Sequence, residues 1–317
     1  MCGVCGCAVR PAESEGHASA HDHGHAHTHV HHVHGHQTDD PHTHSVSHAR
    51  PGGVDDHGMR LVRVEQDILA ANDAIAAANR RAFGERGVVA LNLMSAPGSG
   101  KTTLLVRTIE DLKASRPIAV IEGDQETSFD AERIRATGVA AHQINTGKGC
   151  HLDARMVASA LAHVDFASAL AHVDLAGTLA REDGQAGIVF IENVGNLVCP
   201  AAFDLGEASR VVLLSVTEGD DKPLKYAGMF AAADLLLITK IDLLPFVPFD
   251  LDRCCGFARR VNPAIEIIEV SATRGDGLDR WYAWIAGHCV GAHGHAGLSP
   301  PEATAVATAA ARQTAVE

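Results

Sequence analysis

The sequence has neither a run of basic residues nor a long apolar segment. Its formal net charge is -13 at pH 7, which disfavours a nucleic-acid partner because nucleic-acid-binding proteins present a basic surface. A membrane-spanning helix needs about 18 consecutive apolar residues. The nearest approach, residues 231–249, is interrupted by Asp234, Lys240 and Asp242. We therefore expect a protein that acts without nucleic acid and without a membrane span.

An apolar leader is also lacking near the N-terminus, so we expect a cytoplasmic protein. In that reducing compartment the eight cysteines are expected to be metal ligands or free thiols and not disulfides. The hydrophobic fraction of 46% is sufficient for a full core, and a length of 317 residues allows one or two domains.

A glycine-rich turn at residues 95–103 is the strongest functional signal. It reads Ser-Ala-Pro-Gly-Ser-Gly-Lys-Thr-Thr and matches the phosphate-binding P-loop, with Ser95 at the first glycine position. An apolar strand pattern precedes the turn and a helical pattern follows it. In that context the backbone N–H groups would bind phosphate oxygens, Lys101 would reach the β- and γ-phosphates, and Thr102 would bind Mg²⁺. The predicted phosphate-binding residues are Gly98, Ser99, Gly100, Lys101, Thr102 and Thr103.

Apolar segments of strand length then alternate with helical stretches. A first helix is expected from about Met59 to Phe83. The predicted strands are Val88–Met94, Ile118–Glu122, Ile188–Glu192, Val211–Val216, Leu235–Thr239 and Ile265–Val270. This alternation predicts an α/β fold over residues 59–290, with a mostly parallel sheet and helices on both faces. Ligands of such sheets bind at the carboxyl ends of the strands.

Polar residues follow these strand ends. Asp124 and Glu192 each end a predicted strand, where a carboxylate can hold Mg²⁺, orient water or sense the γ-phosphate. The predicted catalytic set is therefore Lys101, Thr102, Asp124 and Glu192, with Thr102 and Asp124 as the magnesium ligands.

The sequence Thr-Lys-Ile-Asp at residues 239–242 also follows a strand. Asp242 can accept hydrogen bonds from guanine N1–H and N2–H, which adenine does not offer as a pair. Lys240 would lie over the base, and Ser271 and Ala272 could offer backbone N–H groups to guanine O6. Taken alone, this sequence is also compatible with an ordinary strand end, but these pieces occur in the order expected of a GTPase.

Two metal-binding patterns precede the folded domain. Cys2, Cys5 and Cys7, with the α-amine close enough to be a fourth ligand, suit square-planar Ni²⁺ or Cu²⁺, or tetrahedral Zn²⁺. The alternative is three unliganded thiols. The tract from His17 to His48 has a composition that binds divalent transition metals loosely and several at a time, although it could also be a linker or an expression tag. We predict a disordered metal-binding tail over residues 1–58 and another disordered tail over 291–317.

A second metal site is predicted inside the domain. Cys150 and His151 place a thiolate beside an imidazole, and Cys199 lies just beyond the Glu192 strand end. Such ligands leave a tetrahedral Zn²⁺ or a square-planar Ni²⁺ incomplete, and a symmetric dimer could complete it. The alternative is buried, inert cysteines. Cys254 and Cys255 have no ligand pattern and are interpreted as structural.

A tandem duplication interrupts the domain: residues 157–165 and 166–174 differ only at their first position. Nine residues make about two and a half helical turns, so we expect one copy to bulge out or to lengthen the helix end. His163 and His172 are expected at the surface.

Together these motifs resemble the HypB family, GTPases that help insert nickel into nickel–iron hydrogenase. The matching segments are residues 2–7, 95–103, 123–127, 145–154, 192–200 and 219–226, and the histidine tract. The resemblance implies a P-loop NTPase of the SIMIBI type, GTP hydrolysis, GTP-dependent dimerisation, and nickel and zinc binding. It also implies a HypA-type nickel chaperone and a hydrogenase large-subunit precursor as partners. Arg155 stands where some members have a further histidine ligand, and Thr239 where GTPases usually have Asn.

Two other interpretations remain. A nickel storage protein with a scaffold nucleotide domain would explain the histidine tract, but not the order of Lys101, Glu192 and Asp242. A urease-type nickel-insertion GTPase is disfavoured by the N-terminal cysteines and by residues 192–200.

Overall fold

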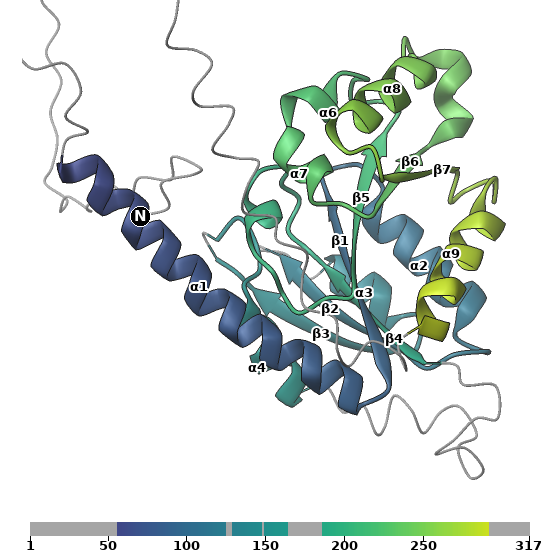
Figure 1. Cartoon of the computed structure of the whole chain (residues 1–317). Helices are drawn as coiled ribbons and strands as arrows, with labels where there is room; N and C mark the ends of the chain where they lie inside the picture. Colours follow the sequence, from purple (N-terminus) through teal and green to yellow (C-terminus); the bar gives the residue numbers. More distant parts are fainter. Residues whose placement is uncertain (1–55, 125–128, 148, 164–185, 292–317) are drawn as a thin grey trace, which may run out of the picture. The chain divides into compact units, whose positions relative to one another are not determined.

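The structure, a computed structural model, describes residues 56–124, 129–147, 149–163 and 186–291 (Figure 1). The chain divides into two compact units, Met1–Glu65 and Gln66–Glu317. Helix α1 (Asp56–Glu85) begins in the first unit, and every other described element belongs to the second. Both predicted tails fall almost wholly outside the described residues, together with Cys2, Cys5, Cys7 and the histidine tract. The predictions for those segments stay predictions.

The second unit is organised around one sheet of seven parallel strands in the order β3-β2-β4-β1-β5-β6-β7 (Figure 1). The strands are β1 (Val88–Ser95), β2 (Ile118–Asp124), β3 (Ala140–Asn145), β4 (Gly187–Glu192), β5 (Ser209–Ser215), β6 (Leu235–Thr239) and β7 (Glu266–Val270). Every residue of β1 is buried, as expected where helices cover both faces of a parallel sheet. The predicted α/β P-loop fold is confirmed.

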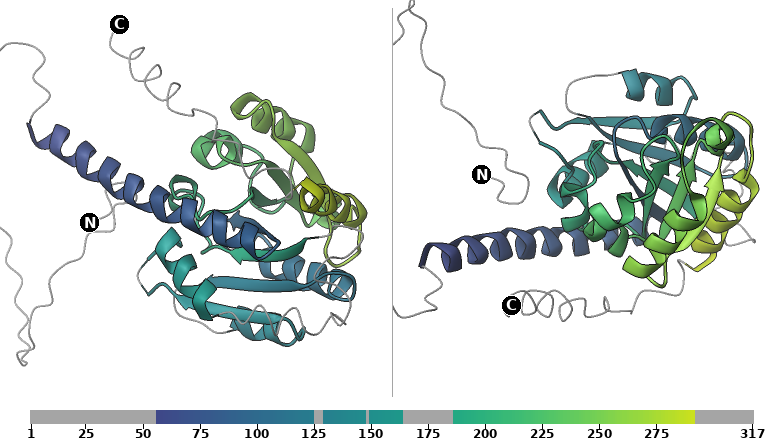
Figure 2. Two further views of the ribbon diagram at one scale, coloured as in Figure 1. Left: turned by 60° about the horizontal axis from the view of Figure 1, so that its bottom comes forward. Right: turned by 90° about the horizontal axis from the view of Figure 1, so that it is seen from above.

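Helices form a layer on each face of this sheet (Figure 2). One layer consists of α2 (Lys101–Leu112), α3 (Phe129–Arg135) and α9 (Leu278–Gly291). The other consists of the C-terminal part of α1, α4 (Ala154–His163), α7 (Ala227–Ala231) and α8 (Leu251–Val261). Successive residues of a strand point to opposite faces, so Val89 and Leu91 pack in the first layer, whereas Val88 and Ala90 pack in the second.

Short helical turns lie in the connections after the strands. They are η1 (Cys199–Ala202), α6 (Lys222–Lys225) and η2 (Ile241–Phe246). No helix in the described ranges is both long and apolar enough to cross a bilayer.

The structure differs from the sequence prediction at the edge strand β3, which was not predicted. Its six residues are Ala-Ala-His-Gln-Ile-Asn, and none of them is fully buried. An edge strand has only one neighbour, so it can form without the apolar run that marks a central strand.

The buried face of α1 combines apolar residues with two asparagines. Ile68 is 51% exposed, whereas Asn72, Ala76, Asn79 and Phe83 are buried. Asn79 Nδ2 donates to Ala154 O at 2.8 Å and to Leu205 O at 3.0 Å. Buried amides that are paired in this way are tolerated in a core, but an apolar pattern does not reveal them.

The first copy of the duplication forms most of α4, which ends at the exposed His163. Its ring stacks on that of His142 at a centroid distance of 5.5 Å. The expectation that His163 lies at the surface is confirmed. The second copy, with His172, lies outside the described residues.

Candidate nucleotide and metal site

The turn between β1 and α2 has the backbone geometry of a phosphate-binding loop. Gly98 has φ 76° and Gly100 has φ 94°, a left-handed conformation that glycine adopts at little cost. Helix α2 begins at Lys101 directly after this turn. Its first backbone N–H groups have no partner within the helix, which makes this helix end suited to an anion.

Lys101 and Thr102 both contact Glu192, at the end of the neighbouring strand β4. Thr102 Oγ1 donates to Glu192 Oε1 at 2.7 Å, and Lys101 Nζ lies 3.4 Å from the same oxygen. The Glu192 residue is only 2% exposed. The structure therefore brings together three of the four residues predicted for catalysis.

A second buried carboxylate, Glu122, lies beside Glu192 in the register of β2 with β4. It is 2% exposed. Burial, followed by the charge of Glu192, raises the pKa of Glu122 to about 8. Oxygen Oε2 of each glutamate is buried without a hydrogen-bond partner. The sequence reasoning did not single out Glu122.

These groups fit a magnesium ion bound with a nucleotide phosphate. Mg²⁺ prefers oxygen ligands and usually retains waters, and unpaired carboxylate oxygens beside the Thr102 hydroxyl are of that kind. Asp124, the fourth predicted residue, is half-buried at the end of β2, next along the sheet from β4. Thr102 and Glu192 are therefore in contact, while the prediction that Thr102 and Asp124 hold Mg²⁺ stays a prediction.

The segment after β6 holds the phosphate loop from its other side. Thr239 Oγ1 donates to Ser99 O at 2.6 Å, and Lys240 Nζ donates to Gly98 O at 2.7 Å. Thr239 thus supplies a side-chain hydrogen bond to the loop at the position where GTPases usually have Asn. Lys240 has a left-handed φ of 59°, which fits a tightly constrained turn.

The residues predicted to recognise guanine also lie together. Ser271 Oγ donates to Asp242 Oδ1 at 2.6 Å. The backbone N–H of Ser271, however, donates to Asp276 O at 2.9 Å. This N–H is thus engaged within the protein, and the prediction that Ser271 donates to guanine O6 stays a prediction. Ala272 keeps that role in the prediction, and Arg107 donates to its carbonyl oxygen at 3.3 Å.

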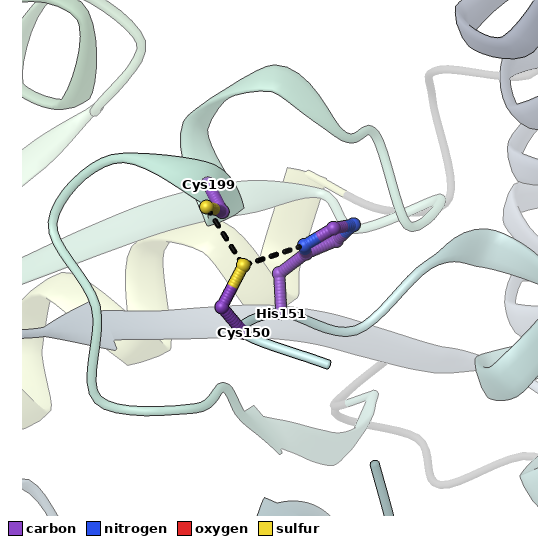
Figure 3. Close-up of side chains that lie close together, drawn as sticks. All are labelled: Cys150, His151 and Cys199. Atoms are coloured by element: carbon purple, nitrogen blue, oxygen red, sulfur yellow. Dashed lines mark hydrogen bonds between the residues drawn. The ribbon is translucent and has the colours of Figure 1, made fainter. Parts of the chain in front are cut away.

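Cys150, His151 and Cys199 form the metal-ligand cluster (Figure 3). One ligand atom from each residue lies within 4.8 Å of the other two. Cys150 Sγ is 2.8 Å from Cys199 Sγ and 3.6 Å from His151 Nδ1. Cys199 begins η1, and the other two residues precede α4, so a predicted association across 49 residues is present in the fold.

The environment of this cluster favours metal binding. Burial lowers the pKa of His151, which keeps its imidazole in the neutral, metal-binding form. Its ring stacks on Phe203 at a centroid distance of 4.0 Å. Two thiols and an imidazole are a soft donor set that suits Zn²⁺ or Ni²⁺ and leaves a coordination position for another ligand. Arg155 is exposed on α4 and is not among the clustered residues.

The segment from Glu192 to Cys199 connects the two parts of the site. Asn193 Oδ1 accepts a hydrogen bond from Leu152 N at 3.1 Å, directly after His151. Asn196 Oδ1 accepts from Val198 N at 2.7 Å, and Asn196 Nδ2 lies 3.5 Å from Cys199 Sγ. Sequence reasoning missed Asn193, Asn196 and Phe203, because nothing in a single sequence announces a hydrogen bond or ring contact between distant segments.

The parallel sheet, together with a glycine-rich loop whose Lys101 and Thr102 contact Glu192 on the adjacent strand, makes this chain a P-loop nucleotide-binding protein. Here that protein also has a cluster of two cysteines and a histidine at the same edge of the sheet. The family described as CobW/HypB/UreG, nucleotide-binding domain, matches residues 89–269. The chain belongs to the HypB family of hydrogenase maturation factors.

Two similar proteins illustrate this relationship. The chain is 60% identical over 226 residues to the hydrogenase maturation factor HypB of Azotobacter vinelandii, covering 71% of this chain and 69% of that protein. It is 56% identical to HypB of Escherichia coli strain K12, covering 71% and 72%.

Two solved structures have the same fold. HypB from Archaeoglobus fulgidus is 40% identical with a TM-score of 0.58, covering 69% of this chain and 98% of that one. HypB from Helicobacter pylori, in complex with nickel, is 38% identical with a TM-score of 0.60, covering 68% and 93%.

Proposed function

We propose that this protein is a GTP-hydrolysing nickel metallochaperone that delivers nickel during maturation of nickel–iron hydrogenase. The observation that carries the proposal is the segment from Glu192 to Cys199, which has at one end a carboxylate that contacts the P-loop residues Lys101 and Thr102, and at the other end a cysteine of the candidate metal cluster. The relatives named hydrogenase maturation factors, and the nickel complex of one of them, support the assignment.

The nucleotide chemistry assigns a separate task to each group. Lys101 leaves Glu192 to bind the β- and γ-phosphates, and Thr102 and Asp124 hold Mg²⁺, which neutralises charge on the phosphates. Glu192 then orients the attacking water. Asp242, which is half-buried, selects guanine, because adenine would not supply the two donors that guanine offers to this carboxylate.

The metal is the cargo in this proposal. Cys150, His151 and Cys199 provide three ligands to Ni²⁺ or Zn²⁺. GTP-dependent formation of a homodimer would complete or close the coordination sphere, so the nucleotide state gates metal binding and transfer. Nickel would arrive from a HypA-type chaperone and leave to the hydrogenase large-subunit precursor.

The test begins with hydrolysis by the full chain of GTP and of ATP in the presence of Mg²⁺. We expect slow hydrolysis of GTP alone. Lys101→Ala should reduce it by about 10²–10³-fold, as removal of one stabilising donor does in other enzymes. Lys113→Ala is the matched control, since Lys113 lies just past the end of α2 and donates to Thr137 O at 2.6 Å. Equal hydrolysis of ATP and GTP would overturn the assignment.

The metal part is tested by equilibrium dialysis of Ni²⁺ and Zn²⁺ with GDP or a non-hydrolysable GTP analogue. Light scattering on the same samples gives the oligomeric state. We expect a dimer only with the analogue, and a change in metal affinity that accompanies it. A metal affinity that is identical in both nucleotide states would contradict the gating.

A further inference from the structure

We infer that Asn193 transmits the nucleotide state to Cys150 and His151 by holding the backbone of Leu152. The inference rests on the proposed gating of metal binding by the nucleotide and assigns a positioning residue to it. Among the described residues, the hydrogen bonds of Asn193 go to Leu93, Asn92, Leu152 and Val194, and none goes to the P-loop or to the three clustered residues. Asn193 acts through Glu192, its neighbour in the chain, and through Leu152, its hydrogen-bond partner.

Asn193 is fixed on the strand side. It follows Glu192 at the end of β4, its backbone N–H donates to Leu93 O at 3.0 Å, and it is 1% exposed. Its side-chain Nδ2 donates to Asn92 Oδ1 at 3.3 Å. This contact sets the orientation of the amide, so that Oδ1 is left to accept from Leu152 N at 3.1 Å and from Val194 N at 3.0 Å.

Leu152 is held from two directions. Asn193 binds its backbone, while its fully buried side chain packs on Gly123 of β2. A Cβ atom at Gly123 would lie 2.7–2.9 Å from three Leu152 side-chain carbons, so only glycine leaves room for this contact. Leu152 therefore lies between Gly123, which precedes Asp124, and Asn193, which follows Glu192. The residue before Leu152 is His151, one of the three clustered residues.

This arrangement makes the position of His151 depend on the end of β4. The Glu192 carboxylate contacts Lys101 and Thr102, which are the residues predicted to bind phosphate and Mg²⁺, so it must rearrange when those ligands take its partners. Asn193, as its chain neighbour, would carry that displacement to Leu152. A metal site tolerates only a few tenths of an ångström in ligand distance, so a small displacement is enough to change affinity. Cys199 is connected to the same strand end through residues 194–198. The positions of Cys199 and of the Cys150–His151 pair therefore both depend on the end of β4.

The experiment measures how strongly the two sites are coupled. It uses the full chain carrying Cys2→Ser, Cys5→Ser and Cys7→Ser, with Co²⁺ as the probe. The thiolate-to-cobalt charge-transfer band reports cysteine-liganded metal and is not produced by the histidine tract. A chelator sets the free Co²⁺ concentration, and titrations are run with GDP and with a non-hydrolysable GTP analogue, each with Mg²⁺.

We expect the Co²⁺ affinities of this background protein in the two nucleotide states to differ by a factor within about 5–150. In Asn193→Ala the ratio should fall toward one, with nucleotide still bound. Asn262→Ala should leave the ratio unchanged. This matched control also loses an amide with several carbonyl partners, including Phe230 O at 3.2 Å and Ala233 O at 2.8 Å, but these lie at the end of α7.

The outcomes separate this inference from the proposed function. No difference between nucleotide states in the background protein would overturn the gating, and this inference with it. A difference that persists in Asn193→Ala would leave the gating intact and overturn the role of Asn193 alone. An equal loss of affinity in both states, with the ratio unchanged, would show a purely structural role and also overturn it.

A second variant decides the matter if Asn193→Ala does not unfold cooperatively in urea. Gly123→Ala displaces Leu152 from the opposite side without altering Asn193. We expect it to lower the affinity ratio as well. If the ratio of Co²⁺ affinities in Gly123→Ala equals that of the background protein although Leu152 is displaced, the inference is overturned.

Discussion

Replacing Glu122 by Gln should stabilise the nucleotide- and metal-free protein at neutral pH. Glu122 is 2% exposed and lies beside Glu192 in the sheet. Burial, reinforced by the neighbouring carboxylate, raises its pKa from 4.5 to about 8. The folded protein therefore keeps a proton on Glu122 at pH values where the unfolded chain has lost it.

The sign and size of the effect follow from this difference. Between pH 4.5 and pH 8 the folded state binds more protons than the unfolded state at this position. The free energy of unfolding therefore falls as the pH rises. Each pKa unit is worth about 1.4 kcal/mol, so the wild type should have lost about 3 kcal/mol at pH 7 through this one group. Glutamine resembles the protonated acid and has no such loss.

Urea unfolding of wild type and Glu122→Gln at pH values from 4.5 to 8 provides the test, with chelator present to remove metals. The difference between the two proteins should be near zero at the acidic end and should grow in favour of the variant as the pH rises. Glu110→Gln, an exposed change on α2, controls for the loss of a charge. A difference that stays constant over this range, or a less stable variant at pH 7, would refute the reasoning.

Two further predictions concern the tail and the packing of α1. Replacing both Cys2 and Cys5 by Ala should abolish one tight nickel site and leave the weak sites of the histidine tract. Deletion of residues 17–48 should remove the weak sites and leave the tight one. Nickel titration of both proteins checks this, and a tight site retained by the cysteine variant would show that the ligands are misassigned. Gly206→Ala should destabilise the protein by about 2–4 kcal/mol, since Gly206 has φ 89° and an added Cβ would meet Ala76 O at 2.6 Å and Arg80 N at 2.8 Å. Gly138→Ala, at φ 88° with no atom within 4 Å of the added Cβ, isolates the backbone cost; equal urea midpoints for the two variants would disprove the proposed contact with α1.

The sequence predicted most of the sheet because its central strands are apolar throughout. The predicted Leu235–Thr239 matches β6, and the predicted Ile188–Glu192 differs from β4 by one residue. The exception was β3, where His142 and Gln143 break the apolar pattern of an edge strand that is only half-buried. A run of apolar residues indicates a strand that is buried on both faces, so a half-buried edge strand is hard to predict from the sequence.

The candidate site could be predicted as far as its chemistry is carried by residue types. Lysine and threonine after a glycine-rich turn, and two cysteines beside a histidine, have few structural uses, and the fold places the members of each group together. The use of backbone atoms could not be predicted. Whether the N–H of Ser271 is available depends on Asp276 O, five residues further on. The shift in Glu122 could not be predicted either, because it depends on the strand order that brings Glu192 beside it.

The contacts from Thr239 and Lys240 to the phosphate loop have a consequence for how a nucleotide binds. The carbonyl groups of Ser99 and Gly98 each accept a hydrogen bond from one of these side chains. Much of the conformational entropy that a glycine-rich turn would otherwise lose on binding has therefore been lost during folding. The same two side chains belong to the segment that precedes Asp242. Two side-chain hydrogen bonds thus join the phosphate loop to the segment predicted to recognise the base, and a change that loosens either segment is expected to weaken affinity for the whole nucleotide.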